Sequence, residues 1–206
     1  SEAYLGHEWC RHWMHVLHLN TNSGKMSKSS GEFLTVSLLE SKGYSPLAYR
    51  FFCMQSHYRK SLVFSYENLD NAAVAYEKLV NRIAALKPAE GEVLDQAAFD
   101  ELKAKFVTAL NGDLNTSLAV TALYDVLKAK CNDATKLAAL ADFDKVLSLN
   151  LIEAAENLKK KQAEEEAANA DPEIDALVAA RTEAKKAKDW ATADKIPRVE
   201  HEAAGT

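Results

Sequence analysis

This sequence predicts a mainly α protein with a short N-terminal α/β part, an antiparallel helical bundle and a small helical C-terminal module. Three observations support this fold class. Residues 13–19 combine aromatic and branched side chains, as strands do. From residue 67 the apolar side chains recur with the 3.6-residue period of helices. Residues 169–172, Asn-Ala-Asp-Pro, interrupt that pattern, and a further helix is predicted to follow them.

Composition and charge separate the N-terminal part from the rest. The 206 residues are 48% hydrophobic and 27% charged, which is typical of globular proteins and excludes collagen-like or low-complexity chains. The net charge is −5, but residues 1–62 carry +3 and the remainder carries −8. Any surface that binds a polyanion is therefore expected in the N-terminal part.

The predicted elements follow in order. The strand at 13–19 precedes the turn formers of residues 20–24. Four amphipathic helices with short connections come next, which predicts an antiparallel bundle with the apolar stripes as its core. The stripes are Leu69, Ala73, Tyr76, Val80 and Ile83, with Leu79 and Leu86 beside them; Phe99, Leu102, Phe106, Ala109 and Leu110; Leu114 through Leu127; and Leu137, Leu140, Phe143 and Leu147.

The C-terminal part is predicted from charge and punctuation. The charge run at residues 159–166 is typical of a solvated helix or a linker. Asp171 is predicted to cap a new helix with Pro172 in its first turn, and Pro197 to end or kink the helix that starts near Trp190. The predicted domains are residues 1–62, 63–168 and 169–206.

The most specific local pattern is Lys25-Met26-Ser27-Lys28-Ser29, which lies between Gly24 and Gly31. Two ammonium groups three residues apart on a glycine-flanked loop, with hydroxyl groups between them, can surround the terminal phosphates of a nucleotide. The alternative is a basic surface loop without a ligand. Five defined side chains after a predicted strand are far more specific than a lone glycine pattern.

Residues 25–29 resemble the KMSKS signature of class I aminoacyl-tRNA synthetases. Other segments, in the same order along the chain, resemble the cysteinyl-tRNA synthetase family and its C-terminal anticodon-binding module, so the resemblance covers nearly the whole chain. These segments are Trp13-Met14-His15, Phe33-Leu34-Thr35-Val36, Ser56-His57-Tyr58-Arg59, Phe64-Ser65-Tyr66-Glu67-Asn68-Leu69, Asp113-Leu114-Asn115-Thr116, Phe143-Asp144-Lys145-Val146-Leu147, Lys188-Asp189-Trp190 and Ala193-Asp194-Lys195-Ile196.

The resemblance implies the C-terminal half of a ligase that activates cysteine with ATP and Mg²⁺ and transfers it to tRNA(Cys). Residues 1–62 would then end a nucleotide-binding α/β domain and carry its stem-contact region, 63–168 would be a tRNA-binding bundle, and 169–206 a truncated anticodon-binding module. Lys25 and Lys28 would be catalytic, because they face the negative charge that grows on the leaving phosphates. The implied ATP-binding residues are His15, Lys25, Met26, Ser27, Lys28 and Ser29.

The same resemblance places the family's second nucleotide signature and its zinc ligands upstream of Ser1. A full-length parent would therefore hold Zn²⁺, whereas this chain alone is expected to be inactive and to hold no metal. Cys10, Cys53 and Cys131 are odd in number and far apart. They are expected to be ordinary core or surface residues in a reducing, cytoplasmic setting.

The histidines near the N-terminus also invite a metal interpretation. At a spacing of three residues, His12, His15 and His18 would line one side of a helix. In the predicted strand, alternation sends His12 and His18 to one face and His15 to the other, which argues against a shared metal. His15 either faces the nucleotide, as the resemblance implies, or is a structural histidine.

Six residues are candidates for contact with tRNA. Arg50 and Arg59 lie where the family places its stem-contact region, with an intramolecular ion pair as the alternative. The i, i+4, i+7 stripe of Arg181, Lys185 and Lys188 either contacts phosphates or is merely solvated. Trp190 either stacks on an anticodon base or packs two terminal helices together.

Two other functions stay open. One is a non-catalytic tRNA-binding or regulatory protein derived from the helical half, although such a binder has no need for two phosphate-facing lysines. The other is a ligase that joins cysteine to a small amino sugar, which would have little use for a basic terminal module. No apolar run approaches the ~20 residues that cross a bilayer. Neither a membrane nor DNA is expected as a partner, and a monomer is favoured.

Overall fold

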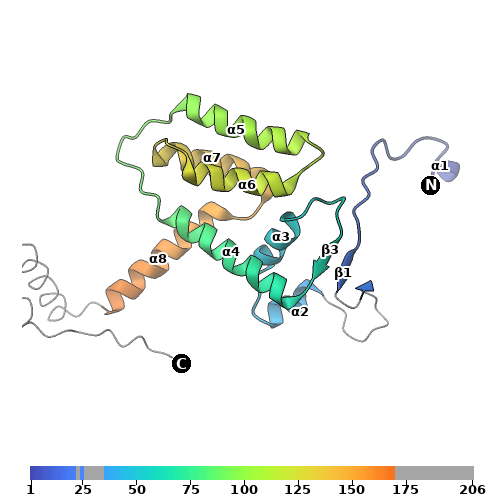
Figure 1. Ribbon diagram of the computed structural model, residues 1–206, viewed down its shortest axis with the longest axis horizontal. Helices are drawn as coiled ribbons and strands as arrows, with labels where there is room; N and C mark the ends of the chain where they lie inside the picture. The colour runs from blue at the N-terminus through green and yellow to red at the C-terminus, as the bar shows by residue number, and fades with distance from the viewer. Residues whose placement is uncertain (22–23, 26–34, 170–206) are drawn as a thin grey trace, which may run out of the picture. The chain divides into compact units, whose positions relative to one another are not determined.

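The computed structural model describes residues 1–21, 24–25 and 35–169, and it is mainly α, as predicted. Packing divides the chain into two compact units, residues 1–157 and 158–206. The helices are α1 (Glu2–Leu5), α2 (Val36–Ser41), α3 (Pro46–Met54), α4 (Tyr66–Ala84), α5 (Gln96–Asn111), α6 (Thr116–Lys128), α7 (Asp133–Leu147) and α8 (Leu151–Asn169). The strands are β1 (Leu19–Thr21), β2 (Gly24–Lys25) and β3 (Leu62–Phe64). Figure 1 labels most of these elements.

A small sheet of order β2-β1-β3 lies in the N-terminal part. β1 pairs with β3 in parallel, with Leu19 opposite Leu62, and with β2 in antiparallel, with Asn20 opposite Lys25. The prediction of a strand over residues 13–19 was wrong, because the strand begins only at Leu19. A strand needs a partner backbone, and β3 provides one for three residues only.

The long helices begin where a side chain caps them. Ser65, Asp95, Asn115 and Asn132 each accept a hydrogen bond from the backbone N–H three residues later, at 2.9–3.1 Å. Such caps satisfy amide groups that the first helical turn leaves without partners. The four amphipathic helices predicted between residues 67 and 147 are confirmed as α4 to α7, each within a few residues of its predicted range.

The grouping of these helices differs from the prediction. α5, α6 and α7 pack on one another, and short connections reverse the chain between them, so that they lie side by side in alternating directions (Figure 1). α4 instead packs chiefly on α3. The physical reason is an aromatic surface on α3, where Phe51 is fully buried and its ring centroid lies 6.0 Å from that of Tyr76 in α4.

A tight turn at residues 147–151 joins the two helix groups. Arg50 Nε donates to the Leu147 carbonyl at 2.7 Å, and the Tyr76 hydroxyl donates to the Leu149 carbonyl at 2.8 Å. The Asp144 carboxylate accepts from the N–H groups of Leu149 and Leu151 at 2.7 and 2.8 Å. These side chains satisfy the last carbonyl of α7, both backbone groups of Leu149 in the turn, and the first N–H of α8.

α8 contains the charge run, whose side chains at 159–165 are exposed, so that the predicted solvated helix is confirmed. Within the described residues, no helix is both long and apolar enough to span a bilayer. The terminal module predicted at 169–206 lies outside the described residues apart from Asn169, the last residue of α8. The functional boundaries predicted at 62 and 168 remain predictions.

Candidate functional site

The predicted phosphate loop follows the β1–β2 hairpin. Lys25 ends β2, and its backbone pairs with that of Asn20. Met26, Ser27, Lys28 and Ser29 lie outside the described residues. The chain is described again from Thr35, whose hydroxyl caps α2 by accepting from the Leu38 N–H at 3.1 Å. The paired strand β2 and the capped helix α2 therefore flank the segment that contains the predicted loop.

His15 lies in the irregular segment that leads into β1. Its ring is 6.4 Å from that of Trp13, at an interplanar angle of 18°, and the Trp13 side chain is 63% exposed. The predicted alternation of His12, His15 and His18 between two strand faces was wrong, since none of these residues lies in a strand. The contact of His15 with a nucleotide remains a prediction.

Arg50 and Arg59, the two described arginines predicted to contact tRNA, both have partners within the chain. Arg50 is the donor that caps the carbonyl of Leu147. Arg59 forms a two-point ion pair with Asp113, from Nε to Oδ2 at 2.5 Å and from Nη2 to Oδ1 at 3.2 Å. The intramolecular ion pair considered for these residues is thus present at Arg59, whose side chain is still 65% exposed.

Asp113 is the centre of this cluster and was not singled out in the sequence. It lies in the connection between α5 and α6, where its φ is 64°. The Tyr58 hydroxyl donates to its carboxylate at 2.6 Å, and His57 Nε2 lies 3.8 Å from Oδ2. Hydrogen bonds from Arg59 and Tyr58 lower the pKa of Asp113 to about 2.

The cluster ties the α3–β3 connection to the three-helix group. Its members come from Ser56-His57-Tyr58-Arg59 and Asp113-Leu114-Asn115-Thr116, two of the segments that carry the family resemblance. The acidic residue at the start of the second segment, which follows Gly112, was the available signal for a partner of Arg59. Nothing in the local sequence indicates that two segments 54 residues apart meet.

The remaining predicted site residues are not described. Arg181, Lys185, Lys188 and Trp190 lie outside the described residues. Within the part of the chain that the structure describes, no three His, Cys, Asp or Glu side chains group as metal ligands do. The described residues therefore do not supply a ligand set for a zinc ion.

Residues 1–74 match the family model of the class I (C) tRNA synthetase catalytic domain. That range contains the hairpin, the loop segment, α2, α3 and the His57–Arg59 segment. The cysteinyl-tRNA synthetase resemblance is thus supported on this range by an independent comparison.

Several curated relatives cover almost the whole chain. The cysteine–tRNA ligase of Novosphingobium aromaticivorans is 43% identical over 192 residues, which are 90% of this chain and 38% of that protein. The cysteine–tRNA ligases of Symbiobacterium thermophilum and Borrelia garinii subsp. bavariensis are 36% and 35% identical over 95% of this chain. The chain spans about two fifths of the length of these relatives.

Proposed function

We propose that this chain is part of a cysteine–tRNA ligase and supplies its phosphate loop and its tRNA-binding helices. The observation that carries the proposal is the likeness to cysteine–tRNA ligases over 90–95% of the chain. A likeness confined to a phosphate loop would fit many nucleotide-binding proteins. This one also runs through the helical part, far beyond the predicted phosphate loop.

In the proposed reaction the carboxylate of cysteine attacks the α-phosphorus of ATP, and the bond to the bridging oxygen breaks as pyrophosphate leaves. A terminal ribose hydroxyl of tRNA(Cys) then takes the cysteinyl group, and AMP leaves. Negative charge grows on the departing phosphates in the first step. Lys25 and Lys28 act on that charge, and Mg²⁺ bound with ATP would share it.

In this proposal Arg59 contacts the stem of the tRNA. The ion pair with Asp113 holds the guanidinium of Arg59 at the surface without burying it. A guanidinium has five N–H donors, and a carboxylate takes only two of them here. The remaining donors are available to an RNA phosphate, which is how Arg59 would contact the tRNA stem.

The proposal is tested on the protein expressed from its natural gene, by cysteine-dependent exchange of pyrophosphate into ATP. Lys28→Ala is expected to lower kcat by about a hundredfold, as removal of one preorganised donor does, with a much smaller change in ATP affinity. Lys78→Ala is the matched control, since Lys78 is an exposed lysine of α4. It is expected to leave exchange unchanged.

The outcomes separate the proposed functions. Exchange that depends on Lys28 and on cysteine supports the ligase. A natural gene product that binds tRNA(Cys) but shows no cysteine-dependent exchange would contradict the ligase and favour the non-catalytic tRNA-binding protein. Equal losses of kcat and of ATP affinity in Lys28→Ala would contradict a contact made mainly in the transition state.

A further inference from the structure

The first compact unit contains a cavity of about 300 Å³ between the segment that leads into β1, helix α3 and the α3–β3 connection. Apolar side chains form most of its wall, among them Leu17, Leu19, Met54 and Leu62. The volume is at the lower end of what small-molecule sites have. A cavity of this size and lining accepts a small molecule with a mostly apolar body.

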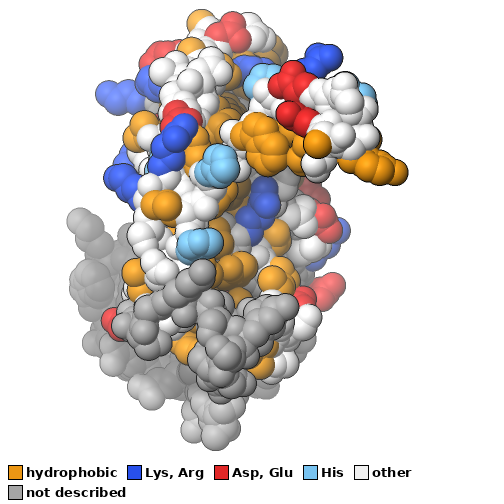
Figure 2. Space-filling model, turned by 90° about the vertical axis from the view of Figure 1, so that its right-hand side faces the viewer, with side chains coloured by type: hydrophobic (Ala, Val, Ile, Leu, Met, Phe, Trp, Pro, Cys, Tyr) orange, Lys and Arg blue, Asp and Glu red, His pale blue; other side chains and the backbone are white. Residues whose placement is uncertain are grey.

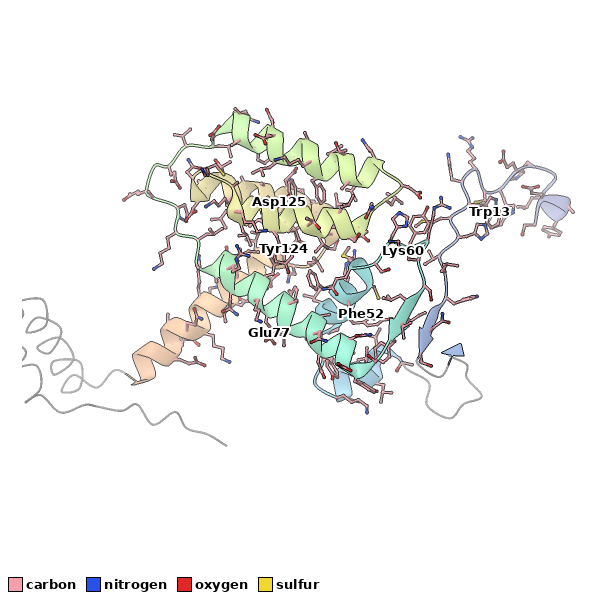
Figure 3. The ribbon with its side chains drawn as sticks, viewed as in Figure 1. Trp13, Phe52, Lys60, Glu77, Tyr124 and Asp125 are labelled. Carbon is pink, nitrogen blue, oxygen red and sulfur yellow. The ribbon has the colours of Figure 1, made fainter. Side chains whose placement is uncertain are left out.

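Basic side chains also line this cavity. Arg50, His57 and Lys60 contribute to the wall, and none of the described lining residues is acidic. Lys60 lies on the α3–β3 connection, between α3 and the segment that leads into β1 (Figure 3). Figure 2 shows hydrophobic side chains next to histidine and basic ones on the face that carries this segment.

Of these three basic groups, only His57 has a carboxylate of the described residues near it. The carboxylate closest in the network, Asp113, lies 3.8 Å from His57 but already accepts from Arg59 and Tyr58. Among the described residues, the Lys60 ammonium has no hydrogen-bond or ion-pair partner. A cation in the wall of an apolar cavity favours a ligand that combines an apolar part with an anionic group. The reason is that a charge-assisted hydrogen bond is stronger than a neutral one.

We propose that this cavity is a binding site for a small organic anion with a flat, apolar body. The apolar body occupies the space between Leu17, Leu19 and Leu62, and its carboxylate, sulfonate or phosphate group meets Lys60 and Arg50. No acidic lining residue repels such a ligand. A neutral molecule of the same shape gains only the apolar contacts and therefore binds more weakly.

Cys53 provides a reporter inside the proposed site. Its thiol belongs to the wall of the cavity, and it is free and half-buried. Burial raises the pKa of this thiol, an effect that a hydrogen bond with Tyr49 and the charge of Arg50 oppose. Cys10 and Cys131 are also free and half-buried, but neither lines this cavity, so the chain carries two internal controls.

The probe is 1-anilinonaphthalene-8-sulfonate, a flat aromatic anion, and its matched control is N-phenyl-1-naphthylamine, which has the same rings without the sulfonate. The full 206-residue chain is treated with a maleimide, and the modification of each cysteine is followed by peptide mass spectrometry. At ten times its Kd the sulfonate probe is expected to slow the modification of Cys53 about tenfold, since about one tenth of the sites stay open. The rates at Cys10 and Cys131 are expected not to change.

Two lysine variants test the role of charge. Lys60→Gln is expected to raise the Kd of the sulfonate probe severalfold and to leave that of the neutral probe unchanged. Lys78→Gln, on α4 and outside the cavity, is expected to change neither. Lys60 and Lys78 are both exposed, so both variants should fold, with circular dichroism as the control.

Any of four results would overturn the proposal. Equal slowing at all three cysteines would mean general adsorption of the probe to the surface. Equal protection by the neutral and the anionic probes, or an unchanged Kd in Lys60→Gln, would show that the basic groups select nothing. No protection of Cys53 at any probe concentration would mean that the cavity takes no ligand of this class. None of these outcomes depends on ligase activity, so the proposed function is tested separately.

Discussion

Arg59 and Arg50 illustrate how an arginine can serve the fold and still be a candidate for RNA contact. Both lie in the part of the chain whose net charge is positive. Arg50 closes the end of α7 through one nitrogen, and Arg59 is fixed by Asp113. An arginine held in this way loses less side-chain entropy when it meets a phosphate, because much of its freedom is already gone.

The ion pair at Asp113 has a defined pH dependence. The pKa of Asp113 is lowered from 3.8 to about 2 in the folded protein. A lowered pKa stabilises the fold at pH values above the unfolded pKa, and this contribution is lost as the pH falls from about 4 towards 2. Asp113→Asn lacks the contribution at every pH.

Melting temperatures of the natural chain and of Asp113→Asn, measured between pH 2 and pH 6, therefore test the pair. Above pH 5 the natural chain is expected to have the higher melting temperature. The difference in melting temperature between the two proteins is expected to vanish near pH 2. The difference in melting temperature above pH 5 should be a few degrees at most, because the ion pair is exposed and screened by solvent. A gap of constant size over the whole range would contradict a titrating ion pair.

At the scale of elements, each of the helices α4 to α7 has a side-chain cap at its start and an apolar stripe. In α6, Asn115 caps the first turn, and Ala119, Val120, Leu123 and Val126 face the core. The stripe of α5 meets that of α7 where the rings of Phe106 and Phe143 stack at 4.2 Å. The three-helix group is thus held mainly by apolar burial, as amphipathic helices generally are.

Two leucines of α6 give a matched test of that burial. Leu123 is fully buried and Leu118 is 53% exposed. Leu123→Ala is expected to lower the free energy of unfolding by about 2–5 kcal/mol, as large-to-small core substitutions do, whereas Leu118→Ala should change it by less than about 0.5 kcal/mol. Urea unfolding of both variants measures the difference. Similar losses in the two variants would contradict the orientation of α6.

At the scale of the whole molecule, the described part combines a hairpin that leads into the loop segment with two helix groups. The Asp113 cluster joins the α3–β3 connection to the three-helix group, and the turn at 147–151 joins α3 and α4 to α7. The segment after α3 therefore contacts the three-helix group through a few polar side chains. The proposed anion-binding cavity borders that segment and includes Thr116 of α6.

The predicted contact of the terminal module with tRNA phosphates is tested by removing its positive charges. If Arg181, Lys185 and Lys188 contact phosphates, replacing all three by Gln should weaken binding of cognate and non-cognate tRNA alike and flatten the dependence of log K on log salt. The predicted helix should survive, since Gln is a good helix former. Titration of labelled tRNA into the natural gene product at several salt concentrations measures the slope, and an unchanged slope would rule out the phosphate role.

Trp190→Ala is the companion variant within that experiment. A ring that stacks on a base would contribute about 1–3 kcal/mol to cognate binding without affecting the salt slope. A lower melting temperature of Trp190→Ala without a specific loss of affinity for cognate tRNA would indicate that Trp190 packs two helices together.

The existence and approximate limits of α4 to α7 follow from the sequence, because helix formation depends on a local 3.6-residue period and on caps next to it. The family resemblance is also a property of the linear sequence, and the match over residues 1–74 supports it, whereas the phosphate loop stays a prediction. Packing partners are different. Three features depend on contacts between segments distant in sequence. These are the packing of α4 on α3, the pairing of Arg59 with Asp113, and the cavity that Cys53, Lys60 and Leu17 line. Tertiary structure alone sets such contacts, since many arrangements satisfy the same local patterns and only side-chain packing selects one of them.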